Sequence, residues 1–196
     1  MDGVRLAHLG DRVALTVNVA AAFAHDPAWA FFLGADYDRL APVFAGALFD
    51  TRVGSGSVWV STDLAAVAMW EKFGGDNVHA VEAEQVWKEY RAVVGSPTSD
   101  RLAEYERALD EVRPSSPYWY LGVLATRPDR QGEGLATAVM TPVLDRADRD
   151  GVDCCLETST IANRAFYQRR GFTHVTTVHI GSGPPTWWLR RPPQRS

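Results

Sequence analysis

The chain has 196 residues, of which 46% are hydrophobic, and this length and composition predict a single domain over residues 1–196 with one core. Its net charge of −4 and the lack of a basic run exclude the electrostatic footprint of a nucleic-acid-binding protein. No apolar run approaches the roughly 18 residues of a membrane span, and the first residues lack the order of a signal peptide, so we expect a cytoplasmic protein without membrane contact.

The first half of the chain predicts a short strand, two helices and a hairpin. In chain order these are a strand at 4–7, a helix from Asp11 that ends before Pro27, a helix at about 37–50, and a hairpin of strands 58–61 and 64–70. The helices are predicted from apolar residues spaced at three and four. Gly54 to Ser57 are expected to form the turn into the first strand of the hairpin.

The second half alternates strands and helices. It predicts helices at 81–94 and from Leu102 to Val112, a strand at 118–125, a helix from Leu135 to Gly151, a strand at 153–158, a helix at 163–170, and strands at 172–180 and 186–190. Gly95 to Ser99 are expected to break the first two helices apart. Pro142 predicts a kink in the long helix and not its end, because proline removes one backbone hydrogen bond.

This order of elements predicts a mixed α/β (α+β) fold. We expect a twisted, mostly antiparallel sheet of about six to seven strands, with helices on both faces and one right-handed parallel crossover. The adjacent cysteines, Cys154 and Cys155, are expected to be reduced strand residues and not a disulfide framework or a zinc site.

One stretch, residues 121–137, predicts a strand, a sharp loop and the start of an amphipathic helix. Gly132 and Gly134 free the backbone of the loop, and the first turn of a helix leaves about four N–H groups unpaired. Such a place binds phosphate. A dinucleotide fold is disfavoured because six residues separate the strand from the first glycine, and the Gly-Lys-Ser/Thr of a nucleoside triphosphate loop is absent.

Two motifs give the chain a family resemblance. Gln131, Gly134 and Ala136 fit the Gln/Arg-x-x-Gly-x-Gly/Ala core of the acyl-coenzyme-A motif, by which this stretch resembles the GNAT acetyltransferase superfamily. Further along, Asn163-Arg-Ala-Phe-Tyr-Gln-Arg-Arg-Gly-Phe172 is similar to the second marker of that superfamily, in the same order and spacing.

Nearly the whole chain is similar to the puromycin N-acetyltransferase type, most weakly at about 25–45 and 75–115, where acceptor-binding residues usually lie. The similar segments include Ala65-Ala-Val-Ala-Met-Trp70, Leu156-Glu-Thr-Ser159 and Pro185-Thr-Trp187. The resemblance implies a GNAT-type three-layer fold and direct transfer of an acetyl group from acetyl-CoA, without a metal. The implied acceptor is the primary amine of a small molecule, such as an antibiotic or aminonucleoside.

The resemblance also implies where the coenzyme binds. Its pantetheine arm enters between the central strand and the strand that carries Glu157, and its diphosphate lies on main-chain amides of the glycine loop. The implied coenzyme-binding residues are Val123, Leu124, Ala125, Thr126, Arg130, Gln131, Gly132, Glu133, Gly134, Leu135, Ala136 and Asn163. Asn163 would either bind the coenzyme or cap its helix.

Tyr167 and Glu157 are the candidate catalytic residues. The resemblance assigns Tyr167 the proton for the departing thiolate, and a phenol is a neutral O–H donor at pH 7; alternatively, Tyr167 is a core aromatic. The central strand holds no carboxylate, so Glu157 is the best acidic candidate for steering or deprotonating the amine, unless it is structural.

The acceptor pocket is predicted to include Asp26, Trp29 and Trp119. Trp119 and Tyr120 are neighbours on one strand and point to opposite faces, so at most one of them reaches a given pocket. Two alternatives to a small-molecule enzyme are a GNAT that acetylates a protein amine and a non-catalytic acyl-CoA sensor. We expect a monomer or homodimer.

Overall fold

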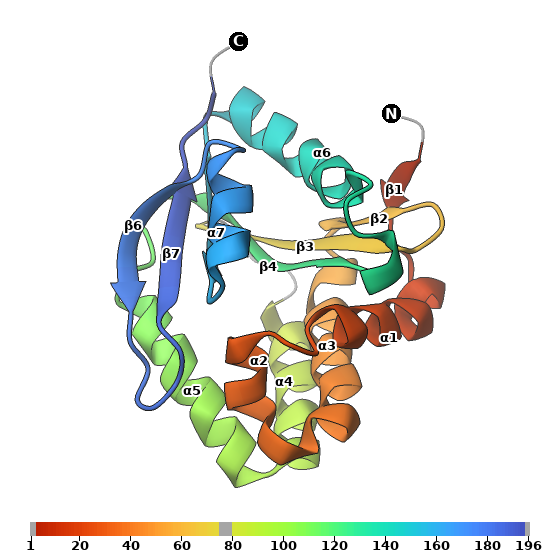
Figure 1. Cartoon of the computed structure of the whole chain (residues 1–196), viewed down its shortest axis with the longest axis vertical. Helices are drawn as coiled ribbons and strands as arrows, with labels where there is room; N and C mark the ends of the chain where they lie inside the picture. Colours follow the sequence, from red (N-terminus) through yellow and green to blue (C-terminus); the bar gives the residue numbers. More distant parts are fainter. Residues whose placement is uncertain (1–2, 75–79, 195–196) are drawn as a thin grey trace.

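A seven-stranded sheet with the strand order β1-β2-β3-β4-β5-β7-β6 divides the protein into three layers (Figure 1). The computed structural model describes residues 3–74 and 80–194. The strands are β1 (Val4–Leu6), β2 (Val58–Ser61), β3 (Ala66–Phe73), β4 (Tyr118–Thr126), β5 (Asp153–Thr158), β6 (Thr173–Val178) and β7 (Thr186–Arg191). Only β4 and β5 are paired in parallel among these strands, which confirms the predicted mixed and mostly antiparallel sheet.

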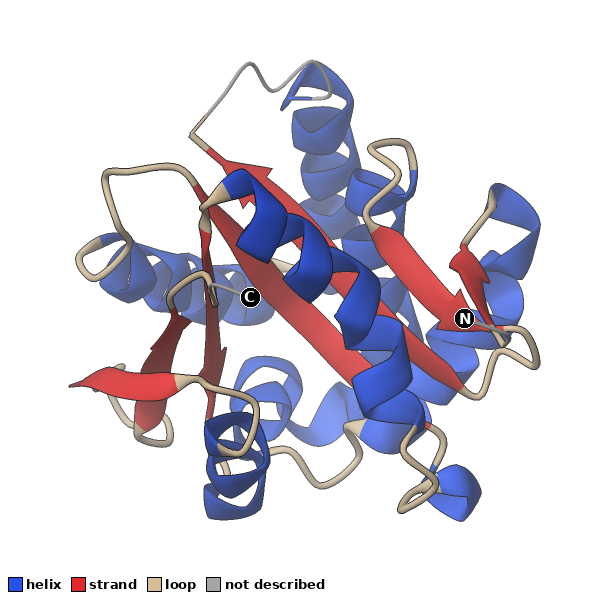
Figure 2. Ribbon diagram, turned by 90° about the horizontal axis from the view of Figure 1, so that it is seen from above, coloured by secondary structure: helices blue, strands red, loops and turns tan. Residues whose placement is uncertain are grey.

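Helices cover both faces of this sheet, as predicted (Figure 2). The helices are α1 (Arg12–Ala22), α2 (Pro27–Leu33), α3 (Tyr37–Val53), α4 (Ala80–Val94), α5 (Ser96–Asp110), α6 (Leu135–Asp150) and α7 (Ile161–Gln168). Residues of α1 to α5 pack against one face, and those of α6 and α7 against the other. The crossover from β4 to β5 runs through α6.

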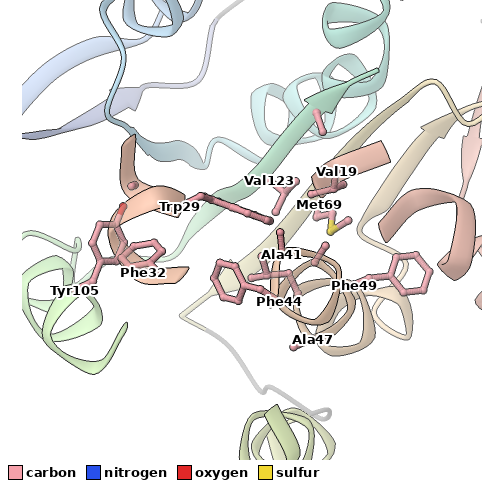
Figure 3. Packing of buried hydrophobic residues seen from close by; sticks show 14 of the residues in the cluster. Val19, Trp29, Phe32, Ala41, Phe44, Ala47, Phe49, Met69, Tyr105 and Val123 are labelled. Atoms are coloured by element: carbon pink, nitrogen blue, oxygen red, sulfur yellow. The ribbon is translucent and has the colours of Figure 1, made fainter. Parts of the chain in front are cut away.

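The layer of α1 to α5 holds a large, aromatic core (Figure 3). Trp29 lies at its centre, with its ring centroid 4.5 Å from that of Phe23 and 4.9 Å from that of Phe44. Phe32 joins this group and contacts Tyr105 of α5 edge to face, at 4.6 Å between centroids. Aromatic side chains therefore connect α2, α3 and α5 into one unit.

A β-bulge interrupts β4 at Gly122. Met69 pairs with Val123, whereas the next residue, Trp70, pairs with Leu121, so Gly122 has no opposite residue in β3. An extra residue in one strand shifts the alternation of its side chains by one position.

The bulge determines which side chains of β4 reach each layer. Tyr120 packs with the layer of α1 to α5, and so does Ala125, five residues later. Leu124 consequently packs with the layer of α6 and α7. A Cβ atom at residue 122 would lie 3.2 Å from Arg52 Nη2 and from the Tyr120 ring, so this crowded position favours glycine.

Two helices differ from the prediction, and a third agrees with it. Helix α2 was not predicted, because its seven residues, Pro-Ala-Trp-Ala-Phe-Phe-Leu, show no helical period. Helix α5 begins at Ser96, inside the stretch expected to be a break, since Pro97 lies in its first turn, where proline is tolerated. Helix α6 continues through Pro142 to Asp150, as expected, and ends at Gly151 in the left-handed conformation.

Candidate active site

β4 and β5 separate beyond a short paired region, as predicted. Their pairing runs from Tyr118 opposite Asp153 to Tyr120 opposite Cys155, yet β4 continues to Thr126 and β5 to Thr158. Within the described part of the chain, the edge of β4 after Tyr120 therefore has no strand partner on the β5 side. Its backbone N–H and C=O groups are available to an extended ligand.

A cavity of about 360 Å³ lies beside this opening, and we call it the coenzyme-side cavity. It is lined by Leu124, Thr126, Arg130, Gln131, Gly132, Gly134, Leu135, Ala136, Thr137, Asn163, Phe166, Tyr167 and Arg170. Nine of the twelve predicted coenzyme-binding residues are in this lining. Val123 and Ala125 are buried on the opposite face, so only their backbone could face a ligand here.

The glycine loop presents backbone to open space. Gly132 has φ +85° and Gly134 has φ +82°, and a Cβ atom at either residue would meet nothing within 4 Å. Both residues occupy a backbone region that side chains disfavour, which explains the glycines. Gly134 precedes α6, whose unpaired N–H groups and dipole favour an anion at this end.

Arg130 lies at the rim of this cavity but is already paired. Its guanidinium donates to Asp63 Oδ2 at 2.7 Å and to the two carboxylate oxygens of Glu133 at 2.8 and 2.7 Å. Glu133 does not line the cavity. Arg130 and Glu133, which were both predicted to bind the coenzyme, are thus paired with each other.

Arg170, which sequence analysis did not single out, is a second cation of this cavity. Its guanidinium lies 3.4 Å from the centroid of the Phe166 ring and donates to the Phe166 carbonyl at 2.8 Å and to Thr137 Oγ1. No carboxylate pairs with it in residues 3–74 and 80–194. Its position three residues after Tyr167 in the second motif is the signal that could have identified it.

Asn163 does not cap its helix. Thr160 is the cap, and its Oγ1 accepts a hydrogen bond from the backbone N–H of Asn163 at 3.3 Å. Of the two alternatives, capping is therefore wrong, and the exposed Asn163 side chain lies at the coenzyme-side cavity.

A larger cavity of about 610 Å³, the acceptor-side cavity, opens on the other side of β4. Its aromatic lining consists of Phe23, Trp29, Phe32, Phe44, Phe73, Trp87, Tyr105, Tyr120 and Tyr167. Leu124 and Tyr167 line both cavities, so the two sites meet at these side chains.

The predicted contribution of Trp119 to the acceptor pocket is wrong. Trp119 is buried in the layer of α6 and α7, where its ring faces Arg146 at 5.3 Å. Tyr120, which points to the opposite face, lines the acceptor-side cavity instead. Alternation along the strand predicted that at most one of these two residues reaches the pocket, and the residue that does so is Tyr120.

Glu157 is a half-buried residue whose carboxylate lies at the wall of the acceptor-side cavity. Its Oε1 accepts hydrogen bonds from the Tyr120 hydroxyl at 2.7 Å and the Tyr105 hydroxyl at 3.2 Å. Its Oε2 is buried and has no hydrogen-bond partner in the described residues. Burial disfavours the charged form and raises the pKa of Glu157 to about 7, although the hydrogen bond from Tyr120 opposes this shift.

Tyr167 is held by packing and remains protonated. Its ring contacts those of Phe166 and Phe172, with centroids 5.3 and 5.7 Å away, and the residue is 7% exposed. Burial, together with the nearby charges of Glu157 and Asp26, raises the pKa of its hydroxyl well above the usual value. Tyr167 is therefore both a core aromatic and a neutral O–H donor between the cavities.

Asp26 lies in the acceptor-side cavity with Trp29, as the prediction for both residues requires. Its Oδ1 accepts hydrogen bonds from the backbone N–H groups of Ala28 and Trp29 at 2.9 and 3.1 Å, which caps α2. Burial raises the pKa of Asp26.

The carboxylates of this cavity differ in their partners. Glu71 pairs with Arg52 at 2.9 Å, and Glu106 and Asp110 both pair with Arg113. Asp26 and Glu157 have no cationic partner among the residues that the structure covers. The whole lining holds five acidic residues and four arginines, Arg52, Arg91, Arg107 and Arg113, so the cavity has a small excess of acidic groups, which favours an ammonium group.

Cys154 and Cys155 are free thiols, buried on opposite faces of β5. Burial raises the pKa of each thiol to about 12. Across 3–74 and 80–194, no three His, Cys, Asp or Glu residues gather as metal ligands would. In the same residues, no helix has the length and apolarity needed to span a bilayer.

Comparisons with known proteins give relatives of one kind. The family model described as "Acetyltransferase (GNAT) family" matches residues 81–172. An uncharacterised N-acetyltransferase of Schizosaccharomyces pombe is 21% identical over 126 residues, which are 60% of this chain and 51% of the relative. The chain thus spans about half the length of that curated relative.

Two solved structures share the fold along their whole length. A histone acetyltransferase HPA2-related acetyltransferase from Corynebacterium glutamicum superposes with a TM-score of 0.68 at 18% identity, covering 99% of this chain and 97% of that one. A Drosophila melanogaster polyamine N-acetyltransferase, which forms N-acetylagmatine, gives 0.67 at 15% identity, covering 96% and 98%. These similarities confirm the predicted three-layer fold.

Proposed function

We propose that the chain is an acetyltransferase of the GNAT family, whose model matches residues 81–172, and that it transfers an acetyl group from acetyl-CoA to the primary amine of a small molecule. The observation that supports this most directly is the pair of cavities that meet at Leu124 and Tyr167. One offers main-chain amides to an anion. The other offers aromatic rings to an ammonium, together with two carboxylates, Asp26 and Glu157, that form no ion pair within the described residues.

The coenzyme-side residues fit acetyl-CoA, which supplies an activated acetyl group as a thioester. Amides of residues 131–136 would bind the diphosphate, since both glycines leave this approach open. The free edge of β4 would bind the extended arm, and Arg170 adds a positive charge that pairs with no carboxylate in the part of the chain that the structure describes. Asn163 supplies an amide side chain at the same cavity.

We assign the proton transfers to Glu157 and Tyr167. Glu157 would accept a proton from the ammonium, because a base with a pKa of about 7 matches neutral pH. The amine nitrogen then bonds to the acetyl carbon as the carbon–sulfur bond breaks. Tyr167 would donate its phenolic proton to the departing sulfur. The second proton, which the nitrogen loses as it becomes an amide, would restore the Tyr167 hydroxyl through solvent, and Glu157 would release the first proton to solvent.

The acceptor that we propose carries an aromatic body beside its primary amine. Nine aromatic rings line the acceptor-side cavity, and an aminonucleoside antibiotic of the puromycin kind combines these two features. Acetylation would remove the positive charge of the amine. We place the reaction in the cytoplasm, where thiols such as Cys154 stay reduced.

The proposal is tested by thiol release from acetyl-CoA with a panel of amines. Puromycin, phenethylamine and agmatine are compared with a peptide that has a free N-terminus. We expect release with the aromatic amines and little with the peptide. If acetyl-CoA binds and no amine gives release, the protein is a sensor; if only the peptide reacts, its acceptor is a protein.

Tyr167→Phe tests the acid role in the same assay. The substitution keeps the ring that packs on Phe166 and Phe172 and removes only the hydroxyl. We expect turnover to fall about 10–100-fold while acetyl-CoA still binds. Unchanged turnover would remove Tyr167 from the reaction.

A further inference from the structure

The two oxygens of the Glu157 carboxylate have different surroundings. Oε1 accepts hydrogen bonds from both tyrosine hydroxyls, of Tyr120 and Tyr105, whereas the buried Oε2 has no partner within the described residues. A buried polar atom without a hydrogen bond is costly and rare in folded proteins. An N–H donor from a bound amine would satisfy it.

Both hydroxyl donors are fixed by packing from separate elements. Tyr120 comes from β4, and its ring is stacked on Trp188, with centroids 6.1 Å apart and planes at 13°. Tyr105 comes from α5, and its ring lies edge to face against Phe32 (Figure 3). The lengths of the two bonds to Oε1, 2.7 and 3.2 Å, rank Tyr120 as the stronger donor.

We propose that Tyr105 and Tyr120 are positioning residues that hold Glu157 by Oε1, so that Oε2 is the atom that binds and deprotonates the acceptor amine. This inference rests on the proposed function, because it concerns the same acceptor. Through Tyr105, helix α5 would help to position Glu157, in addition to lining the cavity.

The hydrogen bonds also favour the ionised form of Glu157, against the effect of burial. The titratable and charged groups that face it are Tyr105, Glu106, Arg113, Tyr120, Cys155 and Tyr167. Burial raises the pKa of both tyrosine hydroxyls well above 10, so they stay donors. Donors stabilise the carboxylate, and removing one would raise the pKa of Glu157 above about 7.

Tyr120→Phe and Tyr105→Phe test the proposal, with Tyr118→Phe as the matched control. Tyr118 lies two residues before Tyr120 on the same face of β4, but its buried hydroxyl has no partner in the described chain. We expect the acid-side pKa of kcat to rise by about one unit in Tyr120→Phe, by less in Tyr105→Phe, and not in Tyr118→Phe. The KM for acetyl-CoA is expected to stay unchanged.

Carbon-13 NMR of labelled glutamate measures the pKa of Glu157 without any substrate. Its signal is assigned by its loss in Glu157→Gln. An upward shift in Tyr120→Phe supports the positioning role even if the panel of amines gives no turnover, which would refute only the proposed function. Equal pKa values of Glu157 in Tyr120→Phe, Tyr105→Phe and the wild type would overturn the inference.

The kinetic effect should also depend on Glu157. In a Glu157→Gln background, Tyr120→Phe is expected to lower the residual rate less than twofold, because the group that it positions is gone. A loss as large as in the wild-type background would show that Tyr120 acts elsewhere and contradict the proposal.

Discussion

The two cavities that meet at Leu124 and Tyr167 are built from different parts of the chain. The coenzyme-side cavity is formed by one continuous stretch, residues 124–137, by α7 and by Arg170, and it includes the backbone of the glycine loop. The acceptor-side cavity takes residues from α2 to α5, from α7 and from β3 to β5. Backbone amides suit one constant ligand, whereas side chains can change the acceptor without disturbing that ligand.

Glu157→Gln should have the largest effect of these substitutions, and it should impair the reaction at the acceptor-side cavity without changing the coenzyme-side cavity. Glutamine keeps the shape and cannot accept the ammonium proton, so we expect kcat to fall about 100–1,000-fold. The affinity for coenzyme A, measured by calorimetry, is expected to change little. Equal losses in both quantities would mean that the two cavities are not independent.

The same carboxylate sets the expected pH dependence. Burial raises the pKa of Glu157 from 4.5 to about 7, and only the ionised form can accept a proton. Below that value kcat should therefore fall about tenfold per pH unit, and Glu157→Gln should abolish this limb of the profile. A profile that stays flat down to pH 5 would contradict the assignment.

Gly132→Val should harm the coenzyme-side cavity alone. Valine at φ +85° is strained and places methyl groups where the diphosphate approaches, so we expect coenzyme A to bind about 10–100-fold more weakly. Gly56→Val is the control, because Gly56 has φ +64° and open space around it, and lines neither cavity. If both variants weaken binding equally, the effect comes from strain.

Asp26→Asn should alter the acceptor side by a smaller amount. Asparagine caps helices about as well as aspartate, so α2 is expected to stay intact while its negative charge is lost. We expect the KM for the amine to rise about three- to tenfold and that for acetyl-CoA to stay the same. An unchanged KM for the amine would leave Asp26 with a capping role alone.

Arg130→Gln should give the smallest change, although the residue belongs to the glycine loop. Its charge is already balanced by Asp63 and Glu133, so we expect coenzyme affinity to change less than about threefold. Arg170→Gln removes a cation that has no carboxylate partner in the described residues, and it should cost more. If Arg130→Gln weakened coenzyme binding more than Arg170→Gln, Arg130 would be the cation that binds the coenzyme.

The fold was predictable where the pattern is local. Strands β2 and β5 have the predicted bounds, since short β-branched or apolar runs lie between turn residues. Helix α2 was missed because every side of it is apolar, so no helical period follows its capping residue, Asp26. Helix α5 began early because Pro97 marks a helix start as readily as a break.

The coenzyme-side residues were easier to predict than the acceptor-side residues, because only the former follow a local pattern. The glycine loop is continuous in sequence, so its residues could be named before the structure was known. Glu157 receives its hydrogen bonds from residues 52 and 37 positions away, and no sequence period links them. Trp119 and Tyr120 could not be told apart, because alternation gives two faces and does not say which one a cavity occupies.

The extra residue at position 122 has a consequence for how β4 tolerates deletions. Without Gly122, Leu121 would still pair with Trp70 and Val123 with Met69, so every side chain downstream would keep its present face. Leu124 would stay beside the layer of α6 and α7, and the ladder with β3 would become regular. The opposite change, a slip that pairs Gly122 itself with Met69, would instead exchange the face of every residue beyond it.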